Sequence, residues 1–151
     1  MNHHLPDEKA EMKRLLVAYA LSFIIAGLGL FLVFLMRDLI LTLLRNSRVT
    51  HWAWTAIDNF ALIVTVMVWL VGVFVTHAYF QKGLQSGRGV RRFFFVLGIV
   101  LLLYFVVGAL PGVLGFGTFT PGIWALIVGA GVAGAGLMVL GRKLPVRDGK
   151  R

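Results

Sequence analysis

The chain has 151 residues, of which 59% are hydrophobic and 14% are charged, and its 15 Lys and Arg against 6 Asp and Glu give a net charge of +9. A soluble globular domain carries about 45–50% apolar and about 25% charged residues, so this composition excludes a water-soluble domain as the body of the chain. The lack of cysteine excludes disulfides, thiolate catalysis and iron–sulfur clusters within it.

Four long apolar stretches occupy most of the sequence. They cover residues 15–36, 57–80, 93–110 and 121–140. A hydrocarbon core about 30 Å thick requires about 20 apolar residues from a helix that rises about 1.5 Å per residue. The sequence therefore predicts an all-α membrane protein with four transmembrane helices in a compact bundle. Residues 1–151 are expected to form a single domain, because the connections are too short to bury a core.

The first stretch, residues 15–36, follows Lys13 and Arg14, which mark the membrane boundary. A signal peptide is the alternative interpretation, but its apolar region would hold about 7–15 residues and end at a small-residue cleavage motif. This run is longer, and it ends at Met36 and Arg37 without such a motif. We therefore expect a retained transmembrane helix.

Small residues recur every four positions within this stretch, at Ala18, Ser22 and Ala26. Such a row lets another helix approach closely, so it predicts a helix-packing surface. Beyond Arg37 the chain is apolar again over residues 39–44. This segment forms either a short helix lying in the outer interface of the membrane or a continuation of the first helix past the bilayer.

The second stretch, residues 57–80, carries the one acidic residue near the apolar zone of a span, Asp58. Thr55 precedes it by three positions, a spacing typical of a capping pair at a helix start, and we favour this interpretation. The alternative is an ion or proton site in which Asp58 pairs with Arg37 across the outer ends of the first two helices. An intramembrane carboxylate indicates function when it lies deep, and Asp58 is predicted at the edge.

Two further polar side chains lie within the second stretch. His77 is the one histidine inside a span, and Trp69 lies near the middle with an indole N–H that needs an acceptor. Haem held between two histidines requires facing positions on two helices, whereas His51 is predicted about a full span away from His77. We therefore predict no cofactor, and the candidate polar sites are Asp58, His77 and Trp69.

The third stretch, residues 93–110, follows Arg91 and Arg92, and we expect its helix to end at Pro111. The connection over residues 111–122 is uncharged and contains two phenylalanines. This composition predicts a segment that lies at the headgroup level or against another protein.

The fourth stretch, residues 121–140, contains the glycine spacing of a dinucleotide-binding turn at Gly129, Gly131 and Gly134. That turn works between a strand and a helix, whereas these glycines lie in the middle of an apolar span. Glycine and alanine at repeated four-residue spacings instead predict a helix-packing surface that includes Gly129, Ala133 and Gly134.

The basic residues predict the orientation in the membrane. Twelve of the 15 Lys and Arg residues precede the first stretch, lie between the second and third, or follow the fourth. By the positive-inside rule, both termini are expected in the cytoplasm (N-in/C-in), with the protein in the inner (plasma) membrane of a cell. The residues expected to contact lipid headgroups, anionic ones included, are Lys13, Arg14, Lys82, Arg91, Arg92, Arg142 and Lys143.

No motif in the sequence specifies an activity. No two acidic residues lie together within a span, so we predict no catalytic residues, no metal ligands and no enzyme. The positive charge flanks the spans, so nucleic-acid binding is not expected. The favoured function is that of an accessory or structural subunit packing against a larger membrane complex. The alternative is a small homo-oligomeric transporter or channel, which normally needs polar groups near the midplane.

Overall fold

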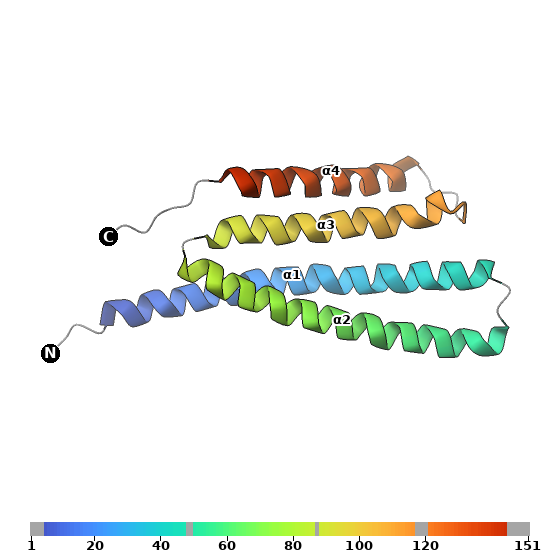
Figure 1. Cartoon of the computed structure of the whole chain (residues 1–151), viewed down its shortest axis with the longest axis horizontal. Coiled ribbons are helices and arrows are strands. Elements are labelled where there is room, and N and C mark those ends of the chain that lie inside the picture. Colours follow the sequence, from blue (N-terminus) through green and yellow to red (C-terminus); the bar gives the residue numbers. More distant parts are fainter. Residues whose placement is uncertain (1–4, 48–49, 87, 117–120, 145–151) are drawn as a thin grey trace.

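The computed structural model describes residues 5–47, 50–86, 88–116 and 121–144, which form four helices (Figure 1). Each helix is long and apolar enough to cross a membrane. The prediction of an all-helical protein with four candidate transmembrane helices is therefore confirmed. The helices are α1 (Leu5–Asn46), α2 (His51–Gln85), α3 (Gly89–Val113) and α4 (Pro121–Lys143).

α1 continues without a break from the first apolar stretch to Asn46, so the alternative of a separate interfacial helix is wrong. The segment between Met36 and Asn46 contains no glycine or proline that would interrupt the helical hydrogen bonds. Leu39 and Leu44 on this extension are buried. The extension therefore packs within the bundle instead of lying alone in the membrane interface.

α2 begins at His51, before the predicted start of the second span. Thr50 occupies the N-cap position with φ −66° and ψ 144°, and its side chain makes no capping hydrogen bond. Residues 51–56 contain no glycine or proline, so nothing prevents the helix from starting this early. Thr55 and Asp58 lie inside the helix, and the predicted capping pair is therefore wrong.

α3 runs through Pro111 and ends at Val113, so the predicted stop at the proline is also wrong. In the last turn of a helix the missing N–H of proline removes only one helical hydrogen bond. Gly115, with φ 74°, ends the helix by turning the chain. Its N–H donates to the Gly112 carbonyl at 3.2 Å, and the Phe116 N–H donates to the Pro111 carbonyl at 2.9 Å. This is the Schellman pattern, which satisfies carbonyls at a helix end.

α3 is the central helix of the bundle. It contacts each of the other three helices, α1 and α2 contact each other, and α4 contacts only α3 among the described residues. Figure 1 shows α4 lying along the side of α3 that faces away from α1 and α2. The arrangement is thus three mutually packed helices with a fourth attached along one side.

The contact between α3 and α4 depends on glycine. A Cβ added at Gly134 would lie 2.9 Å from the Gly98 carbonyl oxygen, and one added at Gly98 would lie 2.8 Å from the Gly134 carbonyl oxygen. A Cβ at Gly131 would lie 2.8 Å from the ring of Phe105. The two helix backbones therefore approach more closely than any side chain between them would allow, a packing mode common in membranes.

Large apolar side chains cover the outside of the bundle. Phe23, Phe60 and Phe74 are 81%, 71% and 74% exposed, as expected where the surrounding solvent is hydrocarbon. The start of α1, the end of α2, the start of α3 and the end of α4 lie together on the left in Figure 1. We call this the basic end, and the opposite end the far end.

Candidate functional site

A polar cluster between α1 and α2 surrounds His77. Its Nδ1 lies 3.0 Å from the Ser22 hydroxyl, and its Nε2 lies 2.9 Å from the Gln81 amide nitrogen. Because an amide N–H donates, Nε2 accepts from Gln81, and the Nδ1–H then donates to Ser22. The Tyr19 ring lies 4.8 Å from the imidazole, measured between ring centres. Both nitrogens of His77 thus have partners, and one of these bonds joins α2 to α1.

Trp69 and Tyr104 attach α2 and α3 to the backbone of α1. The Trp69 indole N–H donates to the Ala26 carbonyl oxygen at 3.1 Å, and the Tyr104 hydroxyl donates to the Leu28 carbonyl oxygen. Gly29 leaves space for the indole, because a Cβ there would lie 2.9 Å from two atoms of the Trp69 ring. In this arrangement Trp69 and Tyr104 join helices, as polar side chains often do in membranes.

Arg37 of α1 and Asp58 of α2 form a bidentate ion pair at the far end. The Arg37 Nε donates to Asp58 Oδ1 at 3.1 Å, and its Nη2 donates to Oδ2 at 2.9 Å. The Asp58 side chain is 17% exposed, and the guanidinium fork covers both of its oxygens. Asp58 is thus paired with Arg37, the residue that the alternative interpretation of the sequence named as its partner. The pair links α1 to α2.

The residues predicted to pack helices lie on different surfaces. Ala18 and Ser22 are buried on α1, and Ser22 bonds to α2. Gly134 packs against α3, whereas no other atom lies within 4 Å of a Cβ built at Gly129. Ala133 is also exposed. The glycine-rich segment of α4 therefore does not form one surface, and within the described chain it does not meet α1.

Five of the exposed small residues of α4 lie on the side of the helix away from α3. Their spacing of three and four positions places them in one row. The three glycines in it have no neighbouring atom within 4 Å of an added Cβ, so no described helix of this chain covers them. We call this row the open α4 face, and it consists of Gly122, Ala125, Gly129, Ala133 and Gly136.

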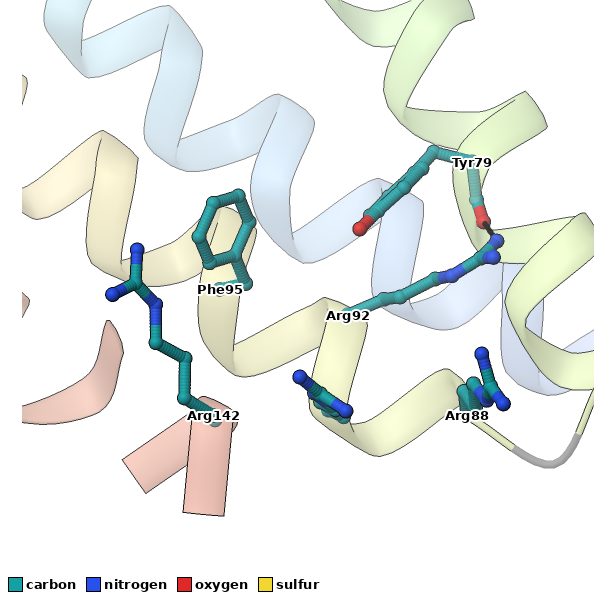
Figure 2. Close-up of a pocket in the computed structure, with 7 residues that line it drawn as sticks. Tyr79, Arg88, Arg92, Phe95 and Arg142 are labelled. Atoms are coloured by element: carbon teal, nitrogen blue, oxygen red, sulfur yellow. Dashed lines mark hydrogen bonds between the residues drawn. The ribbon is translucent and has the colours of Figure 1, made fainter. Parts of the chain in front are cut away.

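At the basic end, arginines from α3 and α4 surround a pocket of about 300 Å³ (Figure 2). Arg91 and Arg92 lie in the first turn of α3, Arg88 is the N-cap residue before it, and Arg142 lies in the last turn of α4. No acidic side chain among the described residues lines this pocket. We call it the arginine pocket, and the lining side chains used below are Arg88, Arg91, Arg92, Arg142, Tyr79 and Phe95.

The predicted headgroup contacts divide into those that line this pocket and those that do not. Arg91, Arg92 and Arg142 line it together with Arg88, which the sequence had not singled out. These arginines line one pocket because α4 packs against α3, and the amino-acid sequence does not show which helices pack together. The predicted headgroup contacts that lie outside the pocket, at the same end and exposed, are Lys13, Lys82 and Lys143. The side chain of Arg14 lies outside the described residues.

An apolar groove lies between α1 and α4 where these helices do not touch. Its volume is about 380 Å³, and residues of α3 form its floor. Leu39 of α1 and Ile127 of α4 stand on its two sides. Two polar residues, Asp38 and Tyr104, also line it. Such a groove at the edge of a bundle can hold a lipid chain or side chains of a neighbouring helix.

Metal-ligating groups do not gather in the described parts of the chain. Among the His, Asp and Glu residues whose side chains the structure describes, no three lie close enough together to hold a metal ion. His3 and His4 lie outside the described residues. His77, the histidine of the second span, is bonded to Ser22 and Gln81, neither of which is an acid.

No protein-family model, curated protein or solved structure matches this chain. The four long apolar helices define its class, a multi-pass α-helical membrane protein. This architecture does not specify an activity. A functional proposal therefore depends on the surfaces and the pocket described above.

Proposed function

We propose that the protein is a non-enzymatic accessory or structural subunit that packs against a larger membrane complex. The observation that carries this proposal is the open α4 face. Helices associate in membranes through rows of small residues, whereas contact with lipid tails requires none. α4 uses Gly134 to approach α3 and presents a second row, around Gly129, with no neighbour within 4 Å. This supports the second row as the contact surface for a transmembrane helix of another protein.

The charge on α4 favours a partner other than a second copy of this chain. Two copies inserted in the same orientation and paired through α4 would hold their helices parallel. Arg142 and Lys143 of both copies would then lie at the same depth. α4 contains no acidic residue to offset them. Like charges brought together in this way disfavour the pair, and a partner helix without them avoids the repulsion.

We further propose the N-in/C-in orientation and the inner (plasma) membrane as the location. The support is the excess of Lys and Arg in the segments that belong to the basic end. Anionic lipid headgroups are then the second class of partner, in contact with that end. The compactness of the bundle stays a prediction, since α4 reaches only α3 within the described chain.

A small homo-oligomeric transporter or channel is the second candidate function. The polar cluster at His77 favours it, because polar side chains within an apolar span often mark an ion or substrate path. Both ring nitrogens of His77 already have partners in this chain, Ser22 and Gln81. The satisfied cluster supports a role in joining α1 to α2, and we therefore rank this function second.

Native mass spectrometry of the tagged protein, extracted gently from its source membrane, tests the proposal. We expect a larger partner at fixed stoichiometry with the wild-type chain. Gly129→Leu should remove the partner, because the new side chain fills the space that the partner helix would occupy. Ala135→Leu is the matched control: Ala135 is exposed on α4 but lies outside the open α4 face, so this variant should keep the partner.

Two outcomes would contradict the proposal. Equal recovery of the partner with Gly129→Leu and with the wild type would exclude docking on the open α4 face. A homo-oligomer alone, in all three samples, would favour the transporter or channel. Loss of the partner through unfolding is checked separately by circular dichroism, which should be unchanged because Gly129 has no neighbour within 4 Å.

A further inference from the structure

The arginine pocket concentrates positive charge that the described chain does not offset. Arg88, Arg91, Arg92 and Arg142 line it without any acidic side chain. The one ion pair among the described residues lies at the far end of the bundle. Four arginines that line one space of about 300 Å³ make its electrostatic potential positive, and this potential would attract an anion into the space.

The positive-inside rule explains why basic residues lie at this end, but not which ones line the pocket. Lys13, Lys82 and Lys143 lie at the same end, yet every cationic side chain in the described part of the pocket lining is an arginine. Arginine presents a planar fork of N–H donors that binds phosphate oxygens in pairs, whereas lysine acts as a point charge. The arginines therefore indicate recognition of an oxyanion rather than general attraction to a charged surface.

The local geometry prepares the site for an anion. The first turn of α3 carries arginines and no acid, although the positive end of a helix dipole favours negative side chains. Arg92 donates to the Tyr79 carbonyl at 2.7 Å, and its guanidinium carbon lies 4.5 Å from the centre of the Tyr79 ring. In the view of Figure 2, Arg142 stands on the other side of Phe95 from Arg92. The Arg92 guanidinium is thus held against α2, and Arg88, Arg91 and Arg142 line the same pocket.

The apolar stretches predict that the pocket lies at the depth of lipid phosphates. Phe95 lies at the start of the apolar stretch 93–110, and Gly141 directly follows the stretch 121–140. The pocket therefore lies where the hydrocarbon meets the headgroup layer. We propose that the arginine pocket binds one phosphate group, carried by an anionic phospholipid or by a soluble phosphate compound. This binding site is independent of the partner proposed for the open α4 face.

Lipid titration of the purified full chain in detergent, followed by native mass spectrometry, tests this site. The probes are phosphatidylglycerol and, with the same acyl chains, phosphatidylcholine; sn-glycerol 1-phosphate is titrated separately by calorimetry. We expect one phosphatidylglycerol to bind more tightly than phosphatidylcholine. The Arg91→Gln/Arg142→Gln variant should bind it about tenfold more weakly or worse, because two charge-assisted bonds are lost.

The matched control removes the same charge from the same end outside the pocket. Lys13→Gln/Lys143→Gln should change the affinity by no more than about twofold, because exposed charges act weakly through water. Arg91→Lys/Arg142→Lys keeps the charge but loses the paired donors, so its affinity should fall below that of the control. If Arg91→Gln/Arg142→Gln does not fold, Arg88→Gln is compared with Lys143→Gln, since each removes one charge at an exposed position.

Each outcome decides the proposal. Arginine-dependent binding of phosphatidylglycerol without binding of sn-glycerol 1-phosphate supports the site with a lipid as its ligand. Arginine-dependent binding of sn-glycerol 1-phosphate supports it with a soluble phosphate compound. Three results would overturn it: equal weakening by the arginine and the lysine variants, equal binding of phosphatidylglycerol and phosphatidylcholine, or no binding of either phosphatidylglycerol or sn-glycerol 1-phosphate.

Discussion

Individual side chains join the helices through bonds to the backbone of α1. The sequence predicted that the Trp69 indole needs an acceptor, but the acceptor is the Ala26 carbonyl, and any residue could supply that atom. Tyr104 makes the same kind of bond to Leu28. Side-chain type therefore predicts that a bond is needed, whereas its partner depends on how the helices are rotated. The space at Gly29 that admits the indole is equally invisible in the sequence.

At the residue scale, Gly29→Ala tests this contact. The added methyl group would lie 2.9 Å from the Trp69 ring, so the indole has to move and its hydrogen bond weakens. Overpacking of this kind lowers the free energy of unfolding by about 1–3 kcal/mol. Gly27→Ala is the matched control, because nothing lies within 4 Å of its added Cβ. Denaturant titration in detergent micelles measures both variants, and an equal effect of the two would contradict the contact.

At the element scale, α4 has two small-residue faces that the sequence could not separate. Gly129 and Gly134 both lie in the glycine-rich segment, and helical spacing alone leaves open which of them meets a neighbour. Gly134 differs from Gly129 because it lies opposite Gly98 of α3, and the two backbones come close where neither glycine has a side chain.

The helix boundaries also differ from those predicted. The length of an apolar stretch indicates which residues cross the membrane, whereas α1 and α2 are helical beyond both ends of their apolar stretches.

Gly134→Leu should detach α4 from α3 without unfolding the other three helices, because among the described helices α4 contacts only α3. The new side chain would meet the Gly98 carbonyl, which cannot rotate away. Since the chain has no cysteine, spin labels at Val106→Cys and Val128→Cys can report the α3–α4 distance by electron resonance. We expect this distance distribution to broaden. The same labels in Gly129→Leu should give the wild-type distribution.

A second label pair controls for general unfolding of the bundle. Phe31→Cys on α1 and Met67→Cys on α2 are exposed and far along the chain from α4. Their distance distribution should stay the same in Gly134→Leu. A change in both pairs would show that α4 supports the whole bundle, and an unchanged α3–α4 distance would show that the glycine contact is not needed.

At the scale of the whole molecule, hydropathy predicted the number of membrane-spanning helices because the bilayer fixes the length of an apolar helix. The arginine pocket could be predicted only in part. Arg91, Arg92 and Arg142 stood out as bases next to spans, but that they surround one space with Arg88 depends on α3 and α4 lying side by side. The sequence thus predicts that basic residues lie at the ends of the spans, whereas the packing of the helices determines which of them line one pocket.

Orientation is the property of the whole molecule that the charge pattern predicts most directly. A reporter enzyme that works only in the cytoplasm should be active when fused after Ser86, at the basic end, and inactive when fused after Ser47, at the far end. A reporter that works only outside the cytoplasm should give the reverse pattern, which controls for unequal expression. Cytoplasmic activity after Ser47 would reverse the orientation. The arginine pocket would then face the outer leaflet, and the proposed phosphate group would belong to a lipid of that leaflet or to a soluble compound outside the cell.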